Sequence, residues 1–122
     1  MKILVADDDR VQVTQLSGRL KALGYQVAVA YDALQASAAV VQDPPNLILL
    51  DIGMPGGMGT EVLKRLRGSP MTSRIPIVIV SGNEDPEIER EVRALGVQGF
   101  FRKPADFEEL HQAIRRILPR DE

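Results

Sequence analysis

Four short apolar runs in this chain each stop at, or shortly before, a residue that can bind a cation or a phosphate. Residues 3–6 precede two aspartates, residues 47–50 precede Asp51, residues 77–80 precede Ser81, and residues 100–101 come shortly before Lys103. Because parallel strands have their carboxyl ends at the same edge of a sheet, these side chains meet there if the four runs are neighbouring strands. The pattern therefore predicts an open α/β sheet with a ligand site at that edge.

Short β-branched runs alternate with amphipathic stretches five times along the chain. This alternation predicts five βα units and a parallel sheet with helices on both faces. Residues 47–50 and 77–80 are apolar without alternation, which indicates central strands buried on both faces, and we expect a loop at 81–83. The expected strands are 2–6, 26–30, 46–50, 77–80 and 97–101, and the expected helices are 9–23, 32–42, 60–67, 85–95 and 106–118.

Aspartates begin four of the expected helices, at Asp9, Asp32, Asp85 and Asp106. A side-chain carboxylate at this position accepts hydrogen bonds from the free backbone N–H groups of the first turn. Asp9 and Asp32 are each followed three residues later by a glutamine, which is the spacing of a capping box. In that motif the later side chain returns a bond to the N–H of the capping residue, so we expect both bonds at these two helices.

The length of 122 residues fits a single domain with one hydrophobic core, which we expect at 1–118, with a solvated tail or the start of a linker at 119–122. The chain has no cysteine, which excludes disulfides and thiolate metal sites and agrees with a reducing cytoplasm. No apolar run approaches the roughly 20 residues of a membrane-spanning helix. The net charge of -2 provides no basic face for nucleic acid. We therefore expect a soluble, cytoplasmic protein that binds neither a membrane nor nucleic acid directly.

Asp7 and Asp8 form an acidic pair at the end of the first expected strand. Capping of the following helix explains Asp9 well, but it explains the pair badly, because adjacent carboxylates repel unless a cation lies between them. Magnesium binds oxygen ligands and needs only one or two protein carboxylates. A zinc site is disfavoured by the absence of cysteine and the single histidine, His111. We infer Mg²⁺, with Mn²⁺ possible in its place.

Asp51, Ser81 and Lys103 follow three other apolar runs. Each has an ordinary interpretation: a turn-forming aspartate, a loop hydroxyl, and a surface lysine whose stem lies along apolar residues. An aspartate can also attack a phosphoryl group and form an aspartyl-phosphate. That transfer needs cations and hydrogen-bond donors around the phosphoryl oxygens, which a metal, Ser81 and Lys103 would supply.

Taken together, these motifs resemble, in order and spacing, the receiver domains of two-component response regulators, including the chemotaxis regulators. The similarity covers essentially the whole chain. It implies a three-layer, doubly wound (βα)5 fold of the flavodoxin-like α/β class, with a five-stranded parallel sheet of order 2-1-3-4-5. The residues that carry it are Asp7-Asp8, Asp51 with Met54-Pro55 and Gly59, Ser81, and Lys103-Pro104.

The resemblance also implies a role for each residue of the site. Asp51 would be the phosphoacceptor, and Lys103 its salt-bridge partner across a cis Lys103-Pro104 peptide. Ser81 and Phe100 would be the switch residues that move on phosphorylation. The metal would be held by Asp8 directly, by Asp7 through water, by Asp51, and by the backbone carbonyl of Gly53.

By the same resemblance, the phosphodonor is a histidine kinase or a histidine phosphotransfer protein. The fourth helix, fifth strand and last helix would form the surface that controls a downstream protein or output domain, in a monomer or a phosphorylation-dependent dimer. The domain would act mainly as a switch, with autophosphorylation from phosphodonors and self-hydrolysis of the aspartyl-phosphate. One alternative is a phosphorylation-independent scaffold of the same fold. Another is an aspartate-nucleophile phosphatase, which is disfavoured because the second acid that such enzymes carry is replaced by Gly53.

Overall fold

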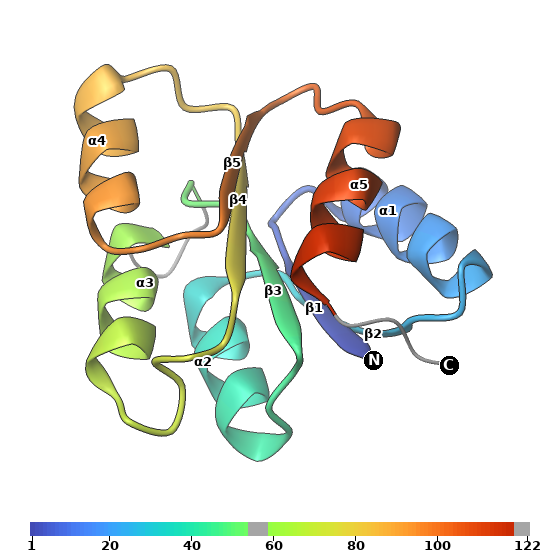
Figure 1. Ribbon diagram of the computed structural model, residues 1–122, viewed down its shortest axis with the longest axis horizontal. Coiled ribbons are helices and arrows are strands. Elements are labelled where there is room, and N and C mark those ends of the chain that lie inside the picture. Colours follow the sequence, from blue (N-terminus) through green and yellow to red (C-terminus); the bar gives the residue numbers. More distant parts are fainter. Residues whose placement is uncertain (54–58, 119–122) are drawn as a thin grey trace.

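The computed structural model describes residues 1–53 and 59–118, so that the Met54-Pro55 motif and the tail expected at 119–122 lie outside the described residues. Strands and helices alternate along the described chain (Figure 1). They are β1 (Lys2–Ala6), α1 (Arg10–Ala22), β2 (Gln26–Ala30), α2 (Ala33–Gln42), β3 (Leu47–Leu50), α3 (Gly59–Gly68), β4 (Ile77–Ser81), α4 (Pro86–Ala94), β5 (Gly99–Arg102) and α5 (Phe107–Ile117). Among the described helices, none has the length and apolar character needed to cross a membrane.

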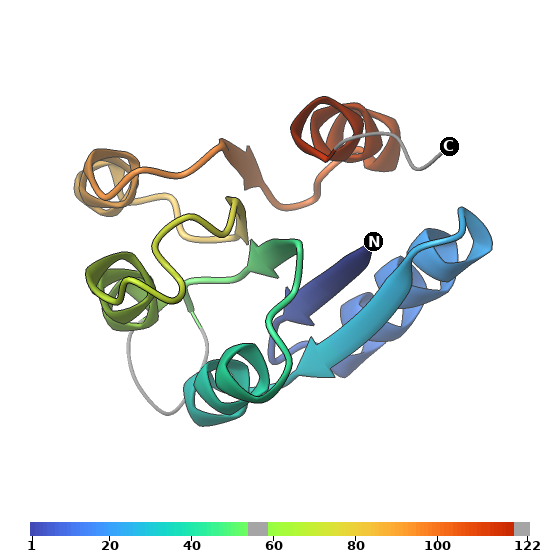
Figure 2. The same cartoon turned by 60° about the horizontal axis from the view of Figure 1, so that its bottom comes forward.

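The strands form one parallel sheet in the order β2-β1-β3-β4-β5, which confirms the predicted doubly wound, flavodoxin-like topology. Helices α1 and α5 cover one face of the sheet, and α2, α3 and α4 cover the other (Figures 1 and 2). Two apolar clusters lie between the sheet and these helix layers. Successive residues of β1 alternate between the clusters, as the two-residue period of a strand requires.

The central strands are the most buried part of the sheet. All four residues of β3 and the first three of β4 are buried, which agrees with the absence of polar alternation in these runs. The edge strands are more accessible: Val29 of β2 is 41% exposed, and no residue of β5 is fully buried. The carboxyl ends of β1, β3 and β4 therefore project from a rigid interior, on which side chains can be held in fixed positions.

Four helices begin as predicted, with Asp9, Asp32, Asp85 and Asp106 accepting hydrogen bonds from backbone N–H groups of the first turn. The predicted return bonds of the two capping boxes are wrong. Asp32 Oδ1 accepts from Gln35 N–H at 2.7 Å as the motif requires, but the Gln35 side chain accepts from Tyr31 N–H at 2.9 Å, one residue before the cap, instead of from Asp32 N–H. The N–H of Asp9 donates instead to the Asp7 carboxylate at 3.0 Å.

Boundaries of β3, β4 and β5 also differ from the prediction by one or two residues. Ser81 is the last residue of β4 and is not in a loop, because its carbonyl accepts a hydrogen bond from Lys103 N–H at 2.9 Å and so extends the ladder with β5. β5 begins at Gly99 rather than at residue 97. Gly24, with φ of 98°, ends the first helix in the left-handed conformation that glycine adopts without strain.

Candidate functional site

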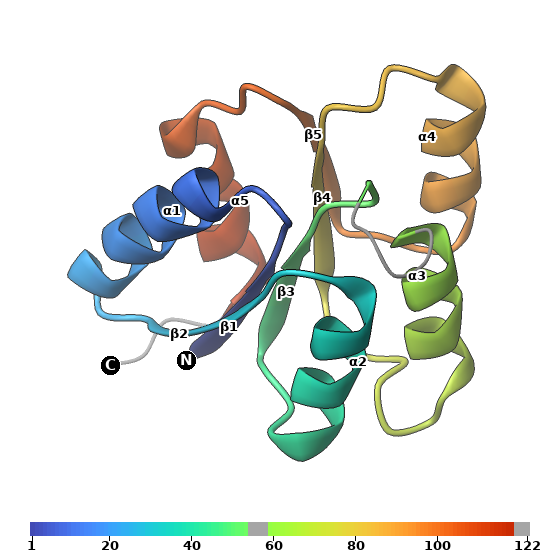
Figure 3. The same cartoon turned by 180° about the vertical axis from the view of Figure 1, so that it is seen from behind.

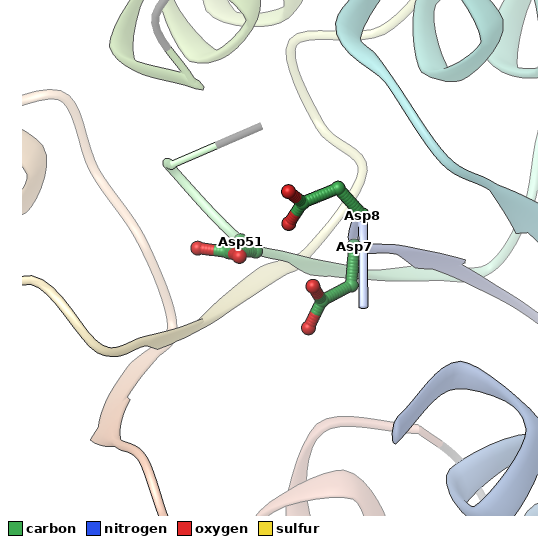
Figure 4. A group of neighbouring side chains, drawn as sticks. All are labelled: Asp7, Asp8 and Asp51. Atoms are coloured by element: carbon green, nitrogen blue, oxygen red, sulfur yellow. The ribbon is translucent and has the colours of Figure 1, made fainter. Parts of the chain in front are cut away.

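The register of the sheet brings three carboxylates to one edge. Ala6 pairs with Leu50, so that Asp7 and Asp51 are the first residues beyond two neighbouring strands. Their backbone N–H groups continue the ladder, Asp7 bonding to the Ala30 carbonyl at 3.0 Å and Asp51 to the Ala6 carbonyl at 2.9 Å. This pairing fixes the backbone on which the acidic side chains stand, and Figure 4 shows those side chains at the ends of β1 and β3.

Asp7, Asp8 and Asp51 each offer a carboxylate oxygen that lies within 4.8 Å of the others (Figure 4). Asp7 and Asp51 are each only 7% exposed, whereas Asp8 is exposed. Oxygens that bind one Mg²⁺ at about 2.1 Å lie at most about 4.2 Å apart across an octahedral shell. Small side-chain rotations would therefore bring these three oxygens to ligand positions, so the donor set fits a hard divalent cation.

Lys103 completes the cluster from the residue that follows β5. In the sheet, β3 and β4 lie between β5 and β1. Its Nζ lies 2.7 Å from Asp7 Oδ2 and 3.2 Å from Asp51 Oδ2. The peptide that follows it, Lys103-Pro104, is cis as predicted. A lysine between two buried carboxylates offsets their mutual repulsion and can also contact an anion attached to either of them.

Burial and ion pairing oppose each other at this cluster. Burial raises the pKa of Asp51 above its ordinary value, although the hydrogen bond from Gly53 N–H at 3.0 Å and the charge of Lys103 act against it. Burial also opposes the charge of Lys103, but the hydrogen bond to Asp7 and the negative charges of Asp51 and Asp7 outweigh it and raise the pKa of Lys103. The ammonium therefore stays charged across the physiological range, as a permanent cation next to the Asp51 carboxylate.

Ser81 and Phe100 stand on the α4 side of the same edge. Ser81 is 1% exposed, and its Oγ accepts a hydrogen bond from Asn83 N–H at 3.0 Å. Phe100, paired with Ile79 of β4, packs partly buried against the apolar cluster beneath α2, α3 and α4.

Arg102 and Arg93, two arginines near this edge, were not predicted from the sequence to take part in the site. Arg102 bonds the Asn83 carbonyl at 2.8 Å, and its guanidinium and that of Arg93 lie 5.6 and 5.4 Å from the centre of the Phe100 ring. Arg102 is two residues after Phe100, and this spacing along one strand places both side chains on the same face. The two-residue period of the strand could therefore have predicted that Arg102 lies near Phe100. It could not have predicted the contacts of these residues with Asn83 and Arg93.

His111 is the single histidine of the chain. It lies on α5, where its ring stacks on that of Phe107 at a centroid distance of 5.9 Å, and the Arg19 guanidinium from α1 lies 4.8 Å from the Phe107 ring centre. The contact between Arg19 and Phe107 joins α1 to α5, which lie side by side in Figure 3. These contacts agree with a packing role for the His111 side chain.

Comparison with known proteins gives a consistent result. The family model for the response regulator receiver domain matches residues 3–115. Sporulation initiation phosphotransferase F of Bacillus subtilis is 33% identical over 118 residues, which cover 97% of this chain and 94% of that protein. The response regulator PleD of Caulobacter vibrioides is 34% identical over 116 residues, which cover 95% of this chain but only 26% of PleD.

Solved structures show the same fold. The chemotaxis response regulator CheY4 of Vibrio cholerae superposes with a TM-score of 0.87 at 30% identity, covering 96% of this chain and 98% of that chain. A response regulator receiver protein from Pseudomonas putida has a TM-score of 0.89 at 29% identity, covering 94% and 95% of the two chains. The family match over most of the sequence, the relatives and the shared topology agree. This chain belongs to the response regulator receiver domain family, whose members accept phosphoryl groups in two-component signalling.

Proposed function

We propose that this chain is a phosphorylation switch in which Asp51 accepts a phosphoryl group from a histidine kinase or a histidine phosphotransfer protein. The observation that carries the proposal is the convergence of the Asp7, Asp8 and Asp51 carboxylates with the ammonium of Lys103. A carboxylate oxygen of Asp51 attacks phosphorus, the bond from phosphorus to the donor nitrogen breaks, and that nitrogen keeps the electron pair. Lys103, which already contacts Asp51 Oδ2, is placed to bond the phosphoryl oxygens.

The carboxylates of Asp7, Asp8 and Asp51, with the carbonyl of Gly53, would hold Mg²⁺, or Mn²⁺ in its place. The bound cation neutralises charge on the phosphoryl oxygens. Gly53 supports this arrangement in two ways: its N–H fixes Asp51 Oδ1 at 3.0 Å, and it places no side chain beside the acceptor. The same absence of an acid two residues after Asp51 argues against an aspartate-nucleophile phosphatase.

The output of the switch would be the α4-β5-α5 face, which contacts a downstream protein or an output domain after Ser81 and Phe100 rearrange. Of the residues of α4, only Val92 is buried, and the helix carries mostly charged side chains. An element held by so few apolar contacts moves at low cost. We propose further that residues 1–118 form the receiver unit, that it acts in the cytoplasm without contacting nucleic acid itself, and that it is a monomer or a phosphorylation-dependent dimer.

Incubation with Mg²⁺ and acetyl phosphate, followed by intact mass measurement, tests the acceptor. The wild type is expected to gain the mass of one phosphoryl group, which EDTA prevents, and Asp51→Asn to gain none. Asp43→Asn, a surface change at a residue that pairs with Lys2, is the matched control and should be modified like the wild type. An unmodified wild type would favour the scaffold alternative, and sustained phosphate release from small esters would favour the phosphatase.

A further inference from the structure

Arg102 lies beside several residues of the proposed switch. It is the last residue of β5, its partner in the register is Ser81, and the next residue is Lys103. Its side chain leaves the strand toward α4 and forks. Nη1 donates to the Asn83 carbonyl at 2.8 Å, and Nη2 donates to Glu89 Oε1 at 2.5 Å. One guanidinium therefore joins β5 to both the β4–α4 loop and α4.

Asn83 links this guanidinium to the Ser81 hydroxyl. Its N–H donates to Ser81 Oγ at 3.0 Å, while its carbonyl accepts from Arg102. The side-chain oxygen of Asn83 also accepts from the N–H of Asp85 at 2.8 Å, and Asp85 caps α4. A rotation of the Ser81 hydroxyl that breaks its bond to Asn83 therefore acts on the residue that Arg102 holds.

Glu89 links the guanidinium to the Phe100 ring. Its carboxylate accepts from Arg93 Nε at 2.9 Å as well as from Arg102, and both arginines lie within 5.6 Å of the ring centre. The hydrogen bond from Arg93 and the charges of Arg102 and Arg93 lower the pKa of Glu89, which keeps the carboxylate ionised. Cations at this distance from an aromatic face attract it, so the ring interacts with two arginines that share one acid.

We propose that Arg102 is a positioning residue that holds the β4–α4 loop, α4 and the Phe100 ring in the unmodified arrangement. Its regulatory part depends on the proposed function, while the positioning contacts do not. We place these contacts in the unmodified arrangement only. Because a contact made in one of two states stabilises that state, removal of Arg102 is then expected to shift the equilibrium toward the phosphorylated arrangement. By linkage, the same removal strengthens binding of a phosphoryl mimic.

Beryllium fluoride with Mg²⁺ is the probe of the modified arrangement, and its affinity is measured by calorimetry. Arg102→Ala is expected to bind it about three- to tenfold more tightly than the wild type, the range for losing one exposed ion pair and one hydrogen bond to a carbonyl. Arg102→Lys should fall between, because one ammonium cannot serve both partners of the fork. Arg90→Ala is the control: Arg90 pairs with Glu87 on the same helix at 2.5 Å, with both side chains over 70% exposed.

Hydrogen exchange of the Asn83 amide, without Mg²⁺ or beryllium fluoride, separates the two proposals. Exchange is expected to be several-fold faster in Arg102→Ala than in Arg90→Ala, with the amides of β3 unchanged in both. A wild type that binds no beryllium fluoride would refute the phosphoacceptor proposal, and the Asn83 exchange rates would still decide the positioning role. Equal exchange in the two variants, or an affinity that stays constant or falls in Arg102→Ala, would overturn the role of Arg102.

Discussion

Replacement of Arg67 by alanine should destabilise the fold more than the same change at Arg65, the other arginine of α3. Arg67 reaches from the end of α3 to three backbone carbonyls: Nε bonds Gly96 at 2.9 Å, and Nη1 bonds Ser73 at 3.1 Å and Ile75 at 2.8 Å. Nη2 bonds the side-chain oxygen of Gln98 at 3.3 Å. A single side chain thus joins α3, the segment before β4 and the segment before β5.

The expected loss in free energy of unfolding follows from these four bonds. A hydrogen bond to a charged group contributes about 1.5–3 kcal/mol, but bonds from one side chain are not additive, and water replaces the donor at the more exposed acceptors. Burial also lowers the pKa of Arg67, which reflects a desolvation cost that the variant no longer carries. We therefore expect Arg67→Ala to lose about 2–4 kcal/mol. Arg67→Lys should lose at least half as much, because a single ammonium cannot span the same acceptors.

Equilibrium urea unfolding followed by circular dichroism measures this loss directly. Arg65→Ala is the matched control, since Arg65 is exposed on the same helix, and it should stay within about 0.5 kcal/mol of the wild type. A loss below about 0.5 kcal/mol for Arg67→Ala would refute the reasoning, since that value is typical of surface substitutions. So would an Arg67→Lys variant as stable as the wild type.

Three further predictions concern the acidic cluster and the glycines. Mg²⁺ at about 100 times its dissociation constant should add about 2.7 kcal/mol to the free energy of unfolding. Most of this gain should be lost in Asp8→Asn. Equal melting temperatures in Mg²⁺ and in EDTA would contradict metal binding. Because burial raises the pKa of Asp51, its ionisation costs stability as pH rises from the unfolded pKa through the folded one. Asp51→Asn in EDTA should therefore stabilise the protein more near about pH 7 than near about pH 4, and a gain in urea unfolding that does not shrink on acidification would exclude this cause. Gly24→Ala should lower the free energy of unfolding by about 1–2 kcal/mol, because the φ of this residue is 98°. Gly99→Ala should be near neutral, since the added Cβ meets its nearest neighbour at 3.5 Å. Urea midpoints that reverse this order would count against the backbone argument.

The position of the site was predictable because it depends on backbone periodicity. Apolar runs that lack alternation identify β3 and β4 as central strands, and parallel strands place the residues that follow them at one edge. The expectation that Asp7, Asp51 and Lys103 meet there, across 96 residues of sequence, is met in the structure. Their chemical roles remain predictions for the mass and calorimetric measurements.

The residue pattern alone determined the fold class and the edge at which the polar side chains gather, because hydrophobic period and strand direction are properties of the chain itself. The strand order 2-1-3-4-5 followed from the family resemblance of the motifs, because the pattern by itself allows several doubly wound orders. Only the tertiary structure decided that Ser81 ends a strand, that Lys103 bridges two carboxylates, and that Arg67 and Arg102 each join several elements. Those contacts depend on which rotamer brings a long side chain to carbonyls distant in sequence. No periodic pattern records that choice, because it is made by packing between elements that are distant in the sequence.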